Sequence, residues 1–160
     1  KRGLAYGASS SLDARRLAGP VVAETQTKNP SAAEVVSIMV DQMKALGEQP
    51  LPADELDPRK ATLIGDFGRE VERNAGVANV IADDLAQDVP VTEIDRFIPN
   101  VEAIDAAAVQ KAAARLLDPK AASIVVVGDA KQFLPDLRKA YPDLEVIEAS
   151  ALDLDRPSLK

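Results

Sequence analysis

The sequence predicts an α+β fold, in which helices pack on one face of a mixed, largely antiparallel sheet. Two β-prone stretches open the chain, helical periodicity fills its middle, and a continuous apolar run ending at Gly128 returns near its end. Strands followed by a block of helices and a βαβ-like close are typical of α+β layering. The predicted order is β-β-α-α-α-α-β-α-β, and 160 residues leave room for one domain.

Two strands are predicted at the start of the chain. Residues 4–12 alternate loosely and carry small and hydroxyl side chains, while residues 19–27 are rich in β-formers after Gly19-Pro20. We expect these two strands to be joined by a short connection.

A first helix is predicted over residues 31–46. Ser31 and Glu34 form a capping-box pattern, and Gly47 supplies a left-handed stop before the prolines that follow. A second, long helix is expected from Asp54 onward.

A third helix is predicted to end near Asp88, and Thr92 with Asp95 suggests a short capped turn. Asp105 can cap an alanine-rich fourth helix, which Asp118-Pro119 closes.

The last part of the chain is predicted to return to the sheet. Residues 124–127 form a continuous apolar run, which suits a strand buried in a sheet interior. A helix over residues 131–140 and a strand over residues 144–148 follow, and residues 151–160 have the composition of a tail.

Composition excludes several classes of function. The formal charge is −7, and the 19 Lys and Arg residues are scattered among 26 acids, which argues against nucleic-acid binding. No apolar stretch is long enough to span a bilayer. The chain contains neither His nor Cys, so it cannot by itself assemble an imidazole-ligated zinc site, a hydrolytic triad or a disulfide. The lack of Cys fits either the cytosol or the periplasm.

Three short motifs have structural interpretations that outweigh functional ones. The run ending in Gly128-Asp129 lacks the further glycines of a nucleotide-binding loop and is interpreted as a turn. The GxxG spacing of residues 65–68 lies inside a helical period. The acids Asp83-Asp84, and the group Asp66, Glu70 and Glu72, are interpreted as solvated helical faces because no metal-loop spacing joins them.

The segment of residues 2–8 (RGLAYGA) carries the sharpest functional candidate, Tyr6. In a regular strand Arg2, Leu4 and Tyr6 share one face, and a Tyr amid tiny residues stands exposed to whatever lies against the strand. The alternative is ordinary cross-strand packing with the hydroxyl at the sheet edge.

Together, this segment, the helices beginning near Ser31 and Asp54, the Asp105 helix ending in Leu-Leu-Asp-Pro and the later IVVVGDA run resemble one known family. That family is the pitrilysin, or insulinase-like, zinc metallopeptidases, and the likeness is to their C-terminal domain, which binds no metal. It covers residues 2–150. It implies that residues 1–150 are a partial domain whose N-terminal part is missing, with residues 151–160 as a tail.

The resemblance implies the non-catalytic, substrate-binding half of a zinc endopeptidase. Zinc would be held by an HxxEH motif in another domain or subunit, so this chain would carry no cofactor and would not be an enzyme alone. Tyr6 matches the family's substrate-contacting Tyr. The family's companion Arg would lie seven residues earlier, upstream of Lys1, so Arg2, only four residues before Tyr6, does not match it.

The implied partners are a zinc-bearing peptidase domain or subunit and a peptide substrate. Bacterial members with fused or separate halves are often exported, so the resemblance favours a periplasmic heterodimer over a cytoplasmic protein. Two alternatives stay open. One is a structural homologue that no longer cleaves, like those in respiratory complexes, and the other is an unrelated acidic α+β interaction module.

Overall fold

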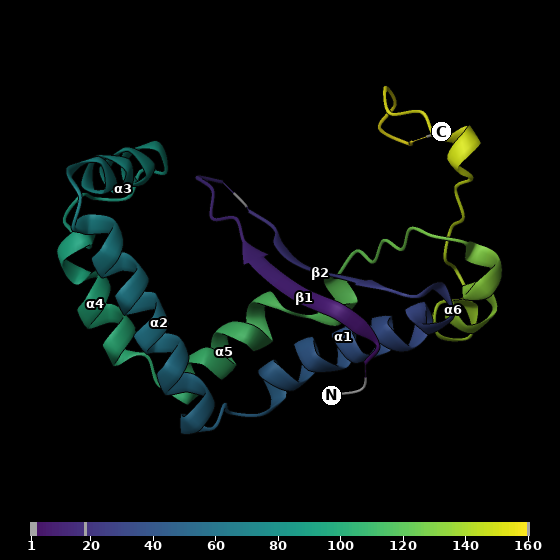
Figure 1. Ribbon diagram of the computed structural model, residues 1–160, viewed down its shortest axis with the longest axis horizontal. Coiled ribbons are helices and arrows are strands. Elements are labelled where there is room, and N and C mark those ends of the chain that lie inside the picture. The colour runs from purple at the N-terminus through teal and green to yellow at the C-terminus, as the bar shows by residue number, and fades with distance from the viewer. Residues whose placement is uncertain (1–2, 18, 160) are drawn as a thin grey trace.

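The computed structural model describes residues 3–17 and 19–159, and its first element is an antiparallel hairpin (Figure 1). Strand β1 (Ala5–Leu12) pairs with β2 (Val21–Thr27). The N–H of Asp13 donates to the carbonyl oxygen of Pro20 at 3.1 Å, which continues the pairing past the ends of the strands. Both strands predicted at the start of the chain are therefore confirmed.

Six α-helices follow within the described residues: α1 (Ala32–Glu48), α2 (Ala53–Val71), α3 (Asn74–Ala86), α4 (Glu93–Ala103), α5 (Ala106–Leu116) and α6 (Leu134–Ala140). The predicted α+β class is confirmed. In Figure 1, α1 and α5 lie beneath the hairpin, whereas α2, α3 and α4 form a separate group at one end of an open arc. No helix in the described part of the chain is long and apolar enough to cross a membrane.

Helices α1 and α5 approach closely at Gly47, which corrects one sequence prediction. Gly47 lies within α1 and has no left-handed backbone, so it does not end the helix. A Cβ at this position would lie 2.9 Å from the Cα of Ala114 on α5. The absent side chain is therefore what lets the two backbones meet. Ser31 precedes α1 as predicted, but its side chain makes no capping hydrogen bond.

Helix α4 is a second correction, because only a short capped turn was expected near Thr92 and Asp95. Thr92 caps nothing with its side chain, and Pro99 lies inside the helix. The ring of Phe97 stacks on that of Phe67 from α2, with centroids 4.2 Å apart. This apolar packing against α2 stabilises a helix whose local sequence signals are weak.

The two strands predicted near the end of the chain do not form. Residues 124–127 and 144–148 are not assigned to any strand, and the sheet within the described residues is the β1–β2 pair alone. Residues 124–127 are also not buried on both faces, since Val125 is 84% exposed and Val127 93% exposed. A strand needs a neighbour to take up its backbone groups, and no strand of the described residues pairs with either segment.

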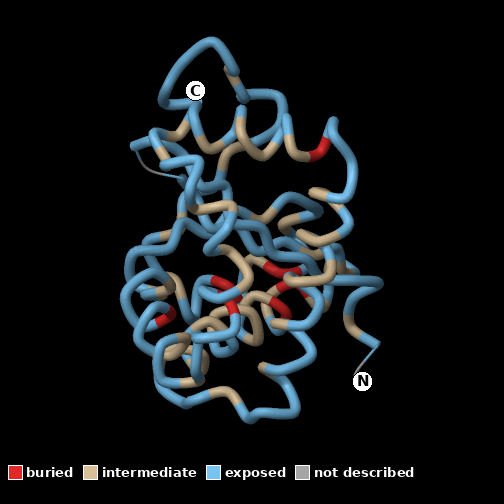
Figure 2. The backbone as a smooth tube through the Cα atoms, turned by 90° about the vertical axis from the view of Figure 1, so that its left-hand side faces the viewer, coloured by how far each residue is buried: buried red, intermediate tan, exposed pale blue. Residues whose placement is uncertain are grey.

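The core is small. Ala32 of α1 packs with Phe133 and Leu137, and Val126 and Leu144 are partly buried against this cluster. Figure 2 shows buried residues as a few short red stretches among exposed backbone. The chain exposes 12393 Å² at a mass of 17.0 kDa, whereas a compact monomer of that size exposes about 7,700 Å². The arc is therefore far more open than a self-contained domain.

Candidate functional site

The candidate site lies on the hairpin, where β1 contains a bulge. Ala5 pairs with Thr27 and Ala8 pairs with Thr25, so β1 has one more residue in this interval than β2 has. The additional length falls at Tyr6 and Gly7. A bulge of this kind turns a side chain out of the regular alternation of a strand, and bulges are frequent beside functional sites.

Two threonine hydroxyls hold the bulge in place. Thr25 Oγ1 donates to the carbonyl oxygen of Gly7 at 2.7 Å, and Thr27 Oγ1 donates to that of Leu4 at 2.5 Å. These bonds satisfy carbonyl groups on both sides of Tyr6, where the ladder is interrupted. Neither threonine was predicted from the sequence, although their two-residue spacing on a strand places them on one face.

Tyr6 is fully exposed, at 105% of its reference area. It borders a shallow hollow of about 420 Å³ whose other walls come from both strands: Gly7, Ala8, Ser9, Glu24, Thr25 and Gln26. Across the hairpin, Ser9 Oγ donates to Glu24 Oε1 at 3.3 Å. The hollow therefore combines small residues with hydroxyl, amide and carboxylate groups, which can hydrogen-bond a polar chain.

The position of β1 leaves one of its edges without a strand. In the described sheet β1 pairs only with β2, so its other edge carries free main-chain donors and acceptors. Tyr6 thus stands beside an edge that an extended peptide can join. Arg2, the other residue named for this segment, lies outside the described residues.

A second hollow, of about 360 Å³, lies among α2, α3 and α4 and was not predicted from the sequence. Its lining is mainly apolar and includes the stacked pair Phe67 and Phe97, with Asp84 and Glu93 among the polar residues. Glu93 is engaged by Arg96 at 3.2 Å. This hollow lies in the helical group and does not include the residues that surround Tyr6.

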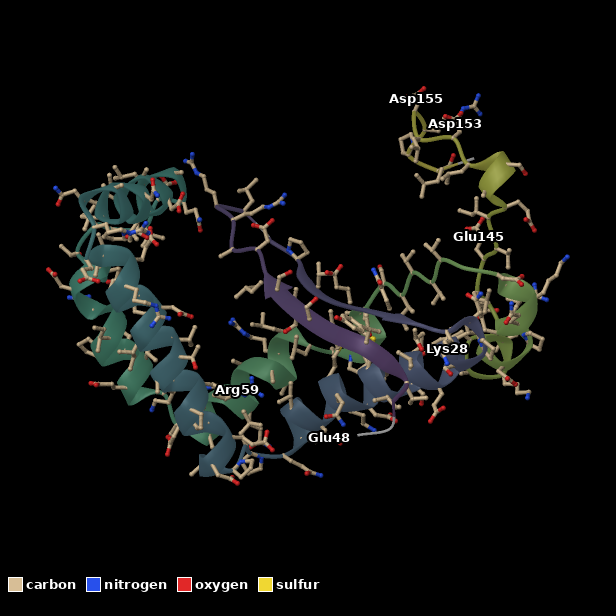
Figure 3. All side chains as sticks on the ribbon, in the orientation of Figure 1. Lys28, Glu48, Arg59, Glu145, Asp153 and Asp155 are labelled. Atoms are coloured by element: carbon tan, nitrogen blue, oxygen red, sulfur yellow. The ribbon has the colours of Figure 1, made fainter. Side chains whose placement is uncertain are left out.

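Two of the acidic helical positions, Asp66 and Glu70, form exposed ion pairs with basic residues one turn away. Asp66 pairs with Arg69, and Glu70 with Arg73 at 3.1 Å, as expected for a solvated helical face. Figure 3 shows further acids on separate parts of the fold, with Glu48 at the end of α1 and Asp153 near the C-terminus. Within the described residues, no three metal-ligating side chains come together.

Arg15, just beyond β1, has a raised pKa. Asp13 raises the pKa of the exposed Arg15 guanidinium, first by accepting a hydrogen bond from it and then by its charge. Arg15 follows the end of β1, away from Tyr6 along the strand. The chemistry of the hollow therefore rests on hydrogen bonding and main-chain pairing.

No model of a protein family matches the chain, and no curated protein matches it either.

Proposed function

We propose that this chain is the non-catalytic, substrate-binding half of a zinc-dependent endopeptidase of the pitrilysin-like kind. It would work with a zinc-bearing HxxEH domain or subunit, in a periplasmic heterodimer. The observation that carries the proposal is the bulge of β1, which turns Tyr6 outward beside an unpaired sheet edge. The chain has no His, so zinc ligands of the HxxEH kind would come from the partner.

An extended peptide fits the free edge of β1 because main-chain pairing needs only regularly spaced donors and acceptors. Such β-augmentation holds peptides of varied sequence, while side-chain pockets along the edge select among them. The small residues Gly7 and Ala8 leave room for the peptide's own side chains in the hollow. Glu24 gives this hollow a carboxylate that favours a basic side chain nearby.

The Tyr6 hydroxyl supplies a hydrogen-bond donor to the bound peptide. In this proposal it donates to a substrate carbonyl oxygen, whose negative charge grows as the carbonyl carbon is attacked. The partner's zinc would supply an activated water. The threonine hydroxyls at the bulge act on catalysis only by keeping Tyr6 in position.

The test is cleavage of an internally quenched decapeptide by the complex purified from the native source. Tyr6→Phe removes only the hydroxyl, so kcat should fall about a hundredfold while the circular dichroism spectrum is unchanged. Tyr141→Phe is the matched control, because Tyr141 is the chain's other tyrosine and packs against the core cluster.

Equal kcat values for the Tyr6→Phe and Tyr141→Phe variants would show that the Tyr6 hydroxyl takes no part in the reaction. A stable complex with no cleavage would instead support the structural homologue. Cell fractionation tests the periplasmic part separately, and recovery of the chain with cytoplasmic markers would contradict it.

A further inference from the structure

Residues 122–128 form an extended segment, in which the N–H of Ala122 donates to the carbonyl oxygen of Pro119 at 3.3 Å. In Figure 1 this segment runs as an uncoiled line between α5 and α6. Within the described part of the chain, no hydrogen bond involves a main-chain N–H or C=O of residues 123–128. The first bond beyond them joins the N–H of Asp129 to Asn29 Oδ1 at 3.4 Å.

The side chains of this segment alternate as they do in a strand that covers a core. Val126 packs against the cluster formed by Ala32, Phe133 and Leu137, whereas Val125 and Val127 point outward and are exposed. The four consecutive β-branched residues 124–127 favour the extended backbone. The segment thus has the conformation, the sequence and the anchoring of a sheet strand without its neighbours.

We propose that residues 122–128 are an acceptor edge, which pairs with an extended strand supplied by a partner polypeptide. Seven residues of strand span about 23 Å, and every second residue presents both its N–H and its C=O to the same edge. A helix or a globular surface could cover Val125 and Val127, but only a strand takes up the main-chain groups as well.

The excess exposed area is too large to be covered by a second copy that pairs only through this segment, so it indicates a larger partner polypeptide. The chain exposes 12393 Å², about 4,700 Å² more than a compact monomer of its mass. Stable complexes of ordinary size bury about 800 Å² on each partner. Pairing two copies through one short strand would leave most of the excess exposed, so a partner that brings a strand and further surface fits better.

A hydrogen bond between Asp129 and Asn29 places the end of the 122–128 segment beside the end of β2. Strand β2 pairs with β1 on one side, and in the described sheet its other side has no strand. The Asn29–Asp129 bond brings the end of the hairpin and the end of the 122–128 segment together without joining them in a ladder. A strand added to residues 122–128 would therefore pair at an edge different from the β1 edge proposed for substrate.

Amide hydrogen exchange of the full-length chain, followed by NMR, tests the proposal. The probe is an acetylated and amidated nonapeptide in which valine alternates with lysine, at about 1 mM. Alternate amides of a strand face the same edge, so exchange should slow at least about tenfold at every second residue of 123–127. The same peptide N-methylated on the amides of its pairing edge should give no protection.

Two variants at one exposed position show whether main-chain pairing causes the slower amide exchange. Val125→Pro removes an N–H and should abolish the protection, whereas Val125→Thr keeps the N–H and the branched shape and should retain it. Val125 is 84% exposed, so neither change disturbs the core.

Three results would overturn the proposal. Unchanged exchange with the probe would mean that the segment accepts no strand. Protection that rises with protein concentration without probe would assign the edge to a second copy. Protection confined to residues 5–12 would place peptide binding at the β1 edge alone. Because none of these results measures turnover, the peptidase proposal stands or falls separately.

Discussion

The hairpin and the 122–128 segment are both rich in β-formers, yet only the hairpin forms a ladder. Leu12 pairs with Val21 across a short connection, so the strands find each other at little entropic cost. Residues 122–128 lie between α5 and α6, where no strand adjoins them in sequence. A β-prone sequence therefore favours an extended backbone, whereas a strand also requires a neighbour to pair with.

The hairpin and the 122–128 segment are also stabilised by different interactions. Every residue of β1 is exposed, so the hairpin depends on main-chain pairing and on hydroxyl bonds such as Thr27 to Leu4. The 122–128 segment has no ladder and is anchored by Val126 on the Phe133 cluster. Substitutions in one region should therefore leave the other region largely unaffected.

The largest effect is expected from Phe133→Ala, which removes the most buried core side chain on the described chain. Truncation of a buried Phe costs about 3 kcal/mol or more through lost burial and the cavity it leaves. Urea denaturation should show this loss, while Phe133→Leu should cost less than about 1.5 kcal/mol. Amide hydrogen exchange of the Phe133→Ala variant should speed up near α6 and not in β1. An equal increase in β1 would mean that the two regions unfold as one cooperative unit, which would contradict the contrast between them.

An intermediate effect is expected from Gly47→Ala, in the helix that lies beneath the hairpin. The added Cβ would meet the backbone of Ala114 at 2.9 Å, so α1 and α5 must separate, at a cost of about 1–3 kcal/mol. Gly68→Ala is the matched control, because a Cβ there meets nothing within 4 Å. That change should stabilise α2 by about 0.5–1 kcal/mol through helix propensity. In thermal denaturation, Gly47→Ala should lower Tm and Gly68→Ala should raise it. A shift of Tm in the same direction for both variants would contradict the explanation by close approach of α1 and α5.

The smallest effect is expected from Thr27→Val, which keeps the side-chain shape and removes the hydroxyl bond to Leu4. Loss of one such hydrogen bond costs about 1 kcal/mol. The change should appear as faster amide exchange within β1 and not around Phe133. Thr92→Val serves as the control, since the Thr92 side chain makes no capping bond. An equal increase in amide exchange across the whole chain would show that the Thr27 hydroxyl bond does not stabilise the bulge locally.

Local signals in the sequence predicted the parts of the fold that local physics decides. Asp105 caps α5 by accepting from the Ala108 N–H at 2.7 Å, as its position before an alanine-rich run indicated. Helix α4 was missed because its stability comes from Phe97 packing on Phe67 of another helix. Gly47 was misread for the same reason, since its partner Ala114 lies on α5.

Tyr6 was singled out from its small neighbours, but its outward position depends on pairing that no local pattern reveals. The sequence alone determined the hairpin, most of the helices and the absence of imidazole, because these depend on residue identity and near neighbours. Only the tertiary structure decided that β1 bulges at Tyr6, that α1 and α5 touch at Gly47 and that residues 122–128 stay unpaired. Those outcomes depend on which distant segments are present to supply contacts, and a single stretch of sequence does not contain that information.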